Sequence, residues 1–376
     1  MIYLDYAATT PLDHRVELAM QPFARALFGN PSSMHQAGRL ARAAVDSARD
    51  CVADLLGARA SEIIFTGSGT EADNLALIGA ARCRKSRGLH IITTAVEHTA
   101  VLSSCRVLEA EGFYVTYLLP NAEGIVEVEQ VVEAVTSETI LVSVMYANNE
   151  VGTIQPIAEI GEQCRERGIL FHSDAVQAAS ELPLSVQQLH VDLMSLSSHK
   201  VNGPKGIGLL YARAGTRLQP LIHGGGQENE RRAGTENVAG IVGFSRALAL
   251  SGSAEETMRI NRLRDLLLDG LLAITASRLH GARKTRLSSN ANVGFDGVAG
   301  ETLLVALDMA GVAISTGAAC SAGALAPSHV LCAMGYIPSR AQEAIRFSLG
   351  RFTTEDEVRQ TIEIVRGVVE QLRNRE

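Results

Sequence analysis

Five polar residues stand where predicted β-strands end, and their types are those of a cofactor site. In open α/β sheets the carboxyl ends of the strands meet at one edge, and ligands bind there. One polar residue at such a position is expected as a helix cap, whereas five at one edge indicate a binding site. The five are Thr70 after the strand 62–67, His98 after 90–95, Asn149 after 140–147, Asp174 at the end of 169–174, and Lys200 after 193–197.

Lys200 and Asp174 form the pair of side chains that pyridoxal phosphate requires. A lysine amine takes the aldehyde of this cofactor, and a carboxylate keeps its ring nitrogen protonated, so that the ring draws off charge. The turn "NGPKG" follows Lys200 directly and fixes its backbone. A lone lysine is usually a solvent-exposed side chain. A buried aspartate on the preceding strand, which needs a partner to offset its desolvation, favours the cofactor instead.

The segment "TGSGTEADN" opens a helix whose first amides are suited to a phosphate. No Gly-Lys-Ser/Thr follows, so it is not a Walker motif. The G-x-G pattern alone is weak, and Thr70 as a simple helix cap is the alternative.

A different nucleophile, Cys320, lies in "ISTGAACSAGALAPSHV" (314–330). Glycine and alanine form few anchoring contacts, so this pattern predicts a mobile loop, with weak or multiple density around 318–326. None of the six cysteines forms a C-x-x-C pair, which favours neither a zinc site nor a disulfide framework. A reducing, cytoplasmic setting is therefore expected.

Composition narrows the functional classes. The chain has 376 residues, 46% of them hydrophobic, and a net charge of −7. This balance argues against binding to nucleic acid or to an anionic membrane. The first residues lack a signal-peptide pattern, and no run of about 18 apolar residues is present, so no membrane span is expected.

Apolar strands that alternate with helical patterns predict an α/β fold with a mostly parallel central sheet flanked by helices. Two further strands are expected at 114–119 and 207–212. After residue 250 the pattern changes to a long amphipathic helix, shorter strands and a final helix. We therefore expect a large domain over 11–250, and a smaller α+β domain that comprises 1–10 and 251–376 and carries the Cys320 loop.

With these residues in place, the chain resembles the cysteine desulfurases, which are fold type I pyridoxal-phosphate enzymes of the class V aminotransferase superfamily. The short Cys320 loop followed by Ser328 and His329 is similar to that of the NifS/IscS-like group. The resemblance runs nearly from end to end, through "YLDYAATTP", "GNPSSMH", "GTEADNLA", "VEHTAV", "NNEVGTIQPI", "HSDAVQ", "SSHKVNGPKG", "GGGQE", "RAGTEN", "STGAACSAG" and "IRFSLGRFTT".

The resemblance implies a role for each site residue. Lys200 forms the Schiff base with the cofactor, Asp174 pairs with its ring nitrogen, Gln177 contacts its ring hydroxyl, and His98 stacks on the ring and shuttles protons. The phosphate is held by Gly69, Thr70, Ser197 and His199, with Thr235 reaching in from a partner subunit.

For the substrate, the resemblance implies that Asn149 and Arg346 bind the carboxylate, and that Cys320 is the nucleophile. The fork of arginine suits a planar carboxylate, although a surface ion pair is the commoner role of an arginine. No metal is expected.

The implied reaction converts L-cysteine to L-alanine and leaves a persulfide on Cys320. A homodimer would pass this sulfur to an acceptor protein for iron–sulfur cluster assembly or for thiolation of tRNA, a cofactor or DNA. Two alternatives stay open, namely a selenocysteine lyase or aminotransferase on the same fold and a non-catalytic partner protein.

Two residues depart from the family pattern. Glu230 stands where the family usually has glycine, and we expect an acid close to Thr235 to weaken phosphate binding or to perturb the dimer edge. Ser198 replaces a small apolar residue, a change expected to be harmless.

Overall fold

The computed structural model describes residues 1–316 and 327–374. Its centre is a seven-stranded sheet in the order β2-β8-β7-β6-β5-β3-β4. Only β8 runs opposite to the other strands of this sheet, so the sheet is mostly parallel, as predicted. The strands are β2 (Ile63–Thr66), β3 (His90–Thr94), β4 (Tyr114–Leu118), β5 (Thr139–Ser143), β6 (Leu170–Asp174), β7 (Leu193–Ser197) and β8 (Gly208–Ala212).

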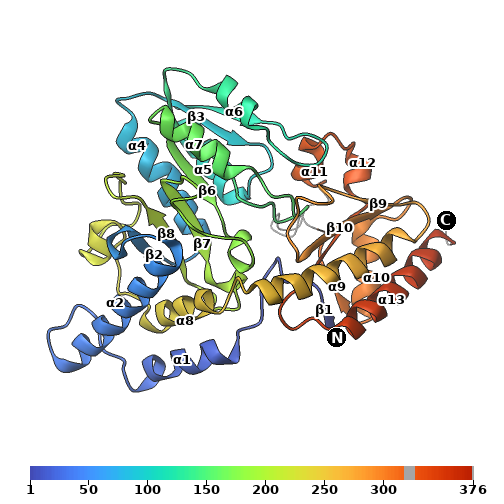
Figure 1. Ribbon diagram of the computed structural model, residues 1–376, viewed down its shortest axis with the longest axis horizontal. Coiled ribbons are helices and arrows are strands. Elements are labelled where there is room, and N and C mark those ends of the chain that lie inside the picture. The colour runs from blue at the N-terminus through green and yellow to red at the C-terminus, as the bar shows by residue number, and fades with distance from the viewer. Residues whose placement is uncertain (317–326, 375–376) are drawn as a thin grey trace.

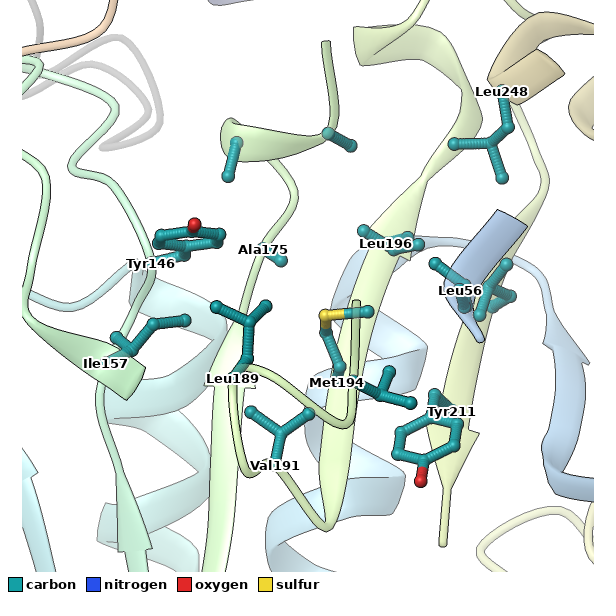
Figure 2. Close-up of a cluster of buried hydrophobic side chains, with 14 of the residues drawn as sticks. Leu56, Tyr146, Ile157, Ala175, Leu189, Val191, Met194, Leu196, Tyr211 and Leu248 are labelled. Carbon is teal, nitrogen blue, oxygen red and sulfur yellow. The ribbon is translucent and has the colours of Figure 1, made fainter. Parts of the chain in front are cut away.

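Helices cover both faces of this sheet, which explains why its strands are apolar throughout. In β2, Ile63 and Phe65 belong to the core on one face, and Ile64 belongs to the core on the other. This alternation is the two-residue period of a strand. The first core, part of which Figure 2 shows around Met194 and Leu196 of β7, also contains side chains of α1 (His14–Arg25), α2 (Gln36–Leu56), α6 (Val128–Ala134), α7 (Ile157–Glu166) and α8 (Val238–Ala249).

On the opposite face lies one continuous helical stretch followed by α5 (Thr99–Ala110). The stretch consists of α3 (Gly69–Asn74), a π-helical turn (Leu75–Gly79) and α4 (Ala80–Arg84). It starts directly beyond β2, so its first turn lies at the sheet edge where the predicted site residues gather.

A separate hydrophobic core belongs to the carboxyl-terminal part of the chain. Leu4 packs into this core, and both chain ends lie on this side of the molecule (Figure 1). Its elements are α9 (Ala254–Leu272), α10 (Gly300–Met309), α13 (Glu355–Arg373), the antiparallel sheet of β9 (Ser277–Leu279), β10 (Asn290–Phe295) and β12 (Ala344–Ser348), and the parallel pair β1 (Ile2–Tyr3) and β11 (Val312–Ala313).

The short helices α11 (His329–Ala333) and α12 (Pro338–Ala341) precede β12. Within the described residues, no helix combines the length and the apolar character that a membrane crossing needs.

Candidate active site

A cavity of about 350 Å³ opens beyond the carboxyl ends of β5, β6 and β7. Ten of the twelve predicted site residues line it, Thr235 does not, and Cys320 lies outside the described residues. The structure thus brings together residues that lie up to 277 positions apart, from Gly69 to Arg346. The ten are Gly69, Thr70, His98, Asn149, Asp174, Gln177, Ser197, His199, Lys200 and Arg346.

Lys200 ends a short 3-10 turn that follows β7. Its Nζ donates hydrogen bonds to the carbonyl oxygens of Ala7, at 2.5 Å, and Ala8, at 2.9 Å. Gln177 Nε2 donates to the same Ala7 oxygen at 2.9 Å. The backbone of the amino-terminal segment therefore positions two side chains of the cavity.

Asp174 is 5% exposed, at the end of β6. One of its oxygens accepts the amide of Val176 at 2.9 Å. Burial raises the pKa of Asp174, and the charge of His98, this amide and the charge of Lys200 oppose the rise. A buried carboxylate in this setting favours a cationic ligand.

His98 caps α5, since its Nδ1 accepts the backbone amide of Ala100 at 3.1 Å. A neutral imidazole that accepts at Nδ1 carries its proton on Nε2. One polar atom each of His98, Asp73 and Asp174 lie within 4.8 Å of one another. His98 is thus in place to act on the same group that Asp174 binds.

Small and hydroxyl side chains form another part of the lining. Ser68, rather than Thr70, caps the helix and accepts the amide of Glu71 at 3.1 Å, so the alternative that Thr70 is the cap is wrong. A Cβ at Gly69 would lie 2.9 Å from Val176 Cγ2, so this close approach requires glycine.

His199 accompanies these residues. Burial, with smaller effects of Lys200 and Lys205, lowers the pKa of His199 to about 4. The imidazole is therefore neutral at pH 7, and one of its ring nitrogens carries a donor N–H.

Arg346 projects from β12 of the carboxyl-terminal part and is 3% exposed, which excludes a surface ion pair. Nη1 donates to the carbonyl oxygen of Asn149 at 2.9 Å, and Nη2 pairs with Asp5 Oδ1 at 2.9 Å. Within the described residues, Nε has no hydrogen-bond partner. A buried guanidinium that lines a cavity and is held in place in this way is suited to bind a carboxylate.

Thr235 does not line this cavity. It lies in a separate pocket of about 120 Å³ with Gly67 and Arg232, and Arg232 forms an ion pair with Glu71 at 2.8 Å. Its function in the site of a partner subunit stays a prediction.

Cys320 lies outside the described residues, as does the expected mobility around 318–326. Described residues on either side of this segment are bonded to Arg346, which lines the cavity, and to Glu97, the neighbour of His98. Ser315 exchanges backbone hydrogen bonds with Arg346 at 3.2 and 2.7 Å, and His329 Nε2 lies 3.0 Å from the carbonyl oxygen of Glu97.

Sequence reasoning predicted no site role for several residues that line or support the cavity, among them Asp5, Ala7, Ala8 and Asp73. Ala7 and Ala8 act through carbonyl oxygens, which every residue type has. The motif "YLDYAATTP", which contains Asp5, Ala7 and Ala8, is part of the family pattern, but its residue types alone predict no role for these three residues.

Ser198, the second departure from that pattern, is fully buried. Within the described residues, its hydroxyl oxygen has no hydrogen-bond partner. Such a group carries a desolvation cost, so the substitution has an energetic consequence beyond its size.

The family model for class-V aminotransferases matches residues 2–361. Cysteine desulfurase IscS of Dictyoglomus turgidum is 48% identical to this chain over 99% of its length and 95% of the relative's. The chain belongs to the cysteine desulfurases of the class-V aminotransferase family. The predicted family and fold class are confirmed.

A further curated relative and two solved structures are similar to this chain over most of its length. Putative cysteine desulfurase IscS 1 of Bacillus subtilis is 50% identical over 99% of both chains. A solved NifS-like protein superposes with a TM-score of 0.93 at 38% identity, covering 98% of this chain and 99% of the other. A solved SspA in complex with cysteine gives a TM-score of 0.84 at 38% identity, covering 94% and 100%.

Proposed function

We propose that this chain is a pyridoxal-phosphate-dependent cysteine desulfurase, which converts L-cysteine to L-alanine and leaves the sulfur as a persulfide on Cys320. One observation carries the proposal. A single cavity holds a lysine amine, a buried carboxylate and a buried guanidinium, in Lys200, Asp174 and Arg346.

The residues present fit pyridoxal phosphate. Asp174 is a buried carboxylate suited to a protonated ring nitrogen, and Lys200 supplies the amine. Thr70, Ser197 and neutral His199 supply donors for a phosphate, beside the close approach that only Gly69 permits. When bound, the cofactor supplies an aldehyde that takes an amine and a ring that draws off electrons.

Arg346 and Asn149 hold the carboxylate of L-cysteine. Asp5 keeps the guanidinium in place through the ion pair to Nη2. Lys200 removes the proton from Cα of the substrate, acting as a base held by the carbonyl oxygens of Ala7 and Ala8. His98 carries its proton on Nε2 and is the second group able to move protons at this cavity.

The sulfur step uses Cys320 as the nucleophile, and its thiolate is the reactive form. The Cys320 sulfur bonds to the sulfur of L-cysteine while the Cβ–S bond breaks. The electron pair of that bond stays on Cβ, which takes up a proton and becomes the methyl group of L-alanine. Sulfur is oxidised to the persulfide level as Cβ is reduced, so no outside oxidant is needed.

The persulfide then passes to an acceptor protein, for iron–sulfur cluster assembly or for thiolation of tRNA, a cofactor or DNA. A two-fold homodimer, in which Thr235 of each subunit completes the phosphate site of the other, is part of this proposal.

The test is a paired product assay. The cofactor-loaded protein is incubated with L-cysteine and a thiol reductant, and L-alanine and sulfide are measured together. We expect equal amounts of both products, and their loss in Cys320→Ala. Products that survive this substitution would instead favour a lyase that acts through the cofactor alone.

A further inference from the structure

A second carboxylate, that of Asp73, lies in the cavity beside Asp174. It projects from α3 and is 1% exposed. One carboxylate oxygen of Asp73 lies within 4.8 Å of a ring nitrogen of His98 and of a carboxylate oxygen of Asp174. Within the described residues, Asp73 Oδ1 has no hydrogen-bond partner. A buried, unpartnered carboxylate oxygen next to another carboxylate needs a physical explanation.

The imidazole of His172, which approaches Asp73, supplies no positive charge. His172 Nε2 lies 3.6 Å from Asp73 Oδ1, but burial lowers the pKa of His172 to about 3, so this imidazole is neutral. Its two nitrogens are already bonded to the hydroxyls of Ser143, at 2.8 Å, and Ser195, at 3.0 Å. Glu97 is a third acid nearby, and it supplies no positive charge either.

Asp174 has the better environment for a negative charge. The Val176 amide donates to it at 2.9 Å, and the charge of Lys200 favours its ionised form. For Asp73, burial is the largest effect on the pKa and the Asp174 charge the next, and both raise it against the opposing hydrogen bond from Ser195. Two buried carboxylates at this separation do not both ionise, and the proton belongs on Asp73, which lacks the favourable charge of Lys200 that Asp174 has.

We propose that Asp73 is a neutral carboxylic acid that shares one proton with Asp174 and thereby keeps Asp174 as the single anion of the pair. Asp73 is then a positioning residue, since a neutral acid donates a hydrogen bond where a carboxylate would repel. That the anion faces the cofactor ring rests on the proposed function. The shared proton itself is a property of the cofactor-free chain.

The first test uses cofactor-free protein and the variant Asp73→Asn, which keeps the shape of the neutral acid. The folded wild type holds a proton that the unfolded chain releases above the ordinary carboxyl pKa of about 4. Stability of the wild type therefore falls relative to the variant as pH rises. Denaturant unfolding from pH 5 to pH 7 should show the variant's folded-to-unfolded ratio gaining about tenfold per pH unit over wild type. Parallel pH dependences would overturn the proposal.

Infrared spectroscopy provides a second measurement that does not depend on how the variant folds. In cofactor-free Glu97→Gln protein at pH 7, a carboxylic-acid C=O band should be present and should shift in D₂O. The Glu97→Gln background removes the third buried acid near this pair. Absence of the band would show that both aspartates are ionised, which contradicts the proposal.

A positioning role also predicts rescue by the conservative variant. Asp73→Leu removes the hydrogen bond, and its dissociation constant for pyridoxal phosphate should rise by about tenfold. Asp73→Asn should restore binding to within about threefold of wild type. Equal weakening by both variants would count against a neutral donor. If the chain proved not to be a desulfurase, the unfolding and infrared results would be unaffected, so the two failures are distinguishable.

Discussion

Glu97 is fully buried and adjoins His98, and its second carboxylate oxygen has no hydrogen-bond partner within the described residues. Burial raises its pKa to about 8, against the opposing hydrogen bonds from the Met145 amide and Thr94 Oγ1. The folded protein therefore keeps a proton that the unfolded chain releases. The free energy of unfolding should fall as pH rises from about 5 to 8 and then level off.

Glu97→Gln should remove this part of the pH dependence. Unfolding of cofactor-free wild type and variant, compared at pH 5 and pH 8, should show the variant gaining on wild type by about 1.4 kcal/mol per pH unit. Glu129→Gln, on an exposed position of α6, is the matched control for the loss of one carboxylate. An unchanged difference across this range would show that Glu97 is ionised.

Glu230, the first departure from the family pattern, is exposed and has a φ of +63°. It follows Glu228 and Asn229, whose φ values are +48° and +54°. A left-handed backbone costs a residue with a Cβ roughly 1 kcal/mol more than glycine. The family's glycine at this position therefore has a conformational reason.

Glu230→Gly should raise the free energy of unfolding by about 1 kcal/mol, measured by denaturant titration. Glu230→Ala removes the charge but keeps the Cβ, so it should give no such gain. If the alanine variant stabilised the protein equally, charge rather than backbone strain would be the cause.

One ion-pair cluster connects the start of α1 with the segment that follows β12. Arg351 donates to Asp13 at 2.8 Å, to Glu256 at 3.0 Å and to the carbonyl oxygen of Leu250 at 2.6 Å. Asp13 also caps α1 and binds Arg15 at 2.7 Å. The hydrogen bond from Arg15 is the main reason why the pKa of Asp13 lies well below its usual range.

Asp13→Asn should keep the helix cap and lose the ion pairs, at a cost of about 1–3 kcal/mol. Asp13→Ala should cost about 1 kcal/mol more, because the cap is lost too. Since the pKa of Asp13 is depressed, wild type should lose its advantage over Asp13→Asn as pH falls below about 4. Thermal unfolding from pH 7 to pH 3 checks this, and a constant difference would contradict it.

At the scale of elements, the sequence predicted all seven strands of the large sheet, because their apolar runs are bounded by polar residues and turns. The strand expected over 140–147 ends at Ser143 instead. Residues 144–147 are buried, so hydrophobicity alone did not reveal where the strand pairing stops. Strands β1 and β11 have two residues each and no periodic signal.

The site was predictable to the extent that residue type reports its chemistry. Lys200, Asp174 and Arg346 have side chains whose charge needs a partner, whereas Ala7 and Ala8 contribute only backbone oxygens. No site role was predicted for Asp73, because its approach to Asp174 depends on how α3 lies over the sheet. The periodicity of a sequence gives no information about the distance between these two carboxylates.

At the scale of the molecule, the position of Thr235 outside its own chain's cavity allows a sharp test of the dimer. Subunits with Lys200→Ala and subunits with Thr235→Val are unfolded together and refolded. If Thr235 serves the partner's site, each mixed dimer regains one intact site, about a quarter of the wild-type total after random pairing. If Thr235 serves its own chain, the mixture should bind no more pyridoxal phosphate with wild-type affinity than the two parents do.

The division at residue 250 and the cytoplasmic setting stay predictions. The two separate cores agree with a large and a small unit, but Arg346 from one and Lys200 from the other line the same cavity. The site therefore needs both cores in place.

The pairing of β1 with β11 also bears on the order in which the chain is completed. Ile2 pairs with Val312, so β1 has no partner strand until about 310 further residues have been synthesised. Contacts so distant in sequence form slowly. Arg346, which lines the cavity, is made later still, so until then a nascent chain is a scaffold without a working site.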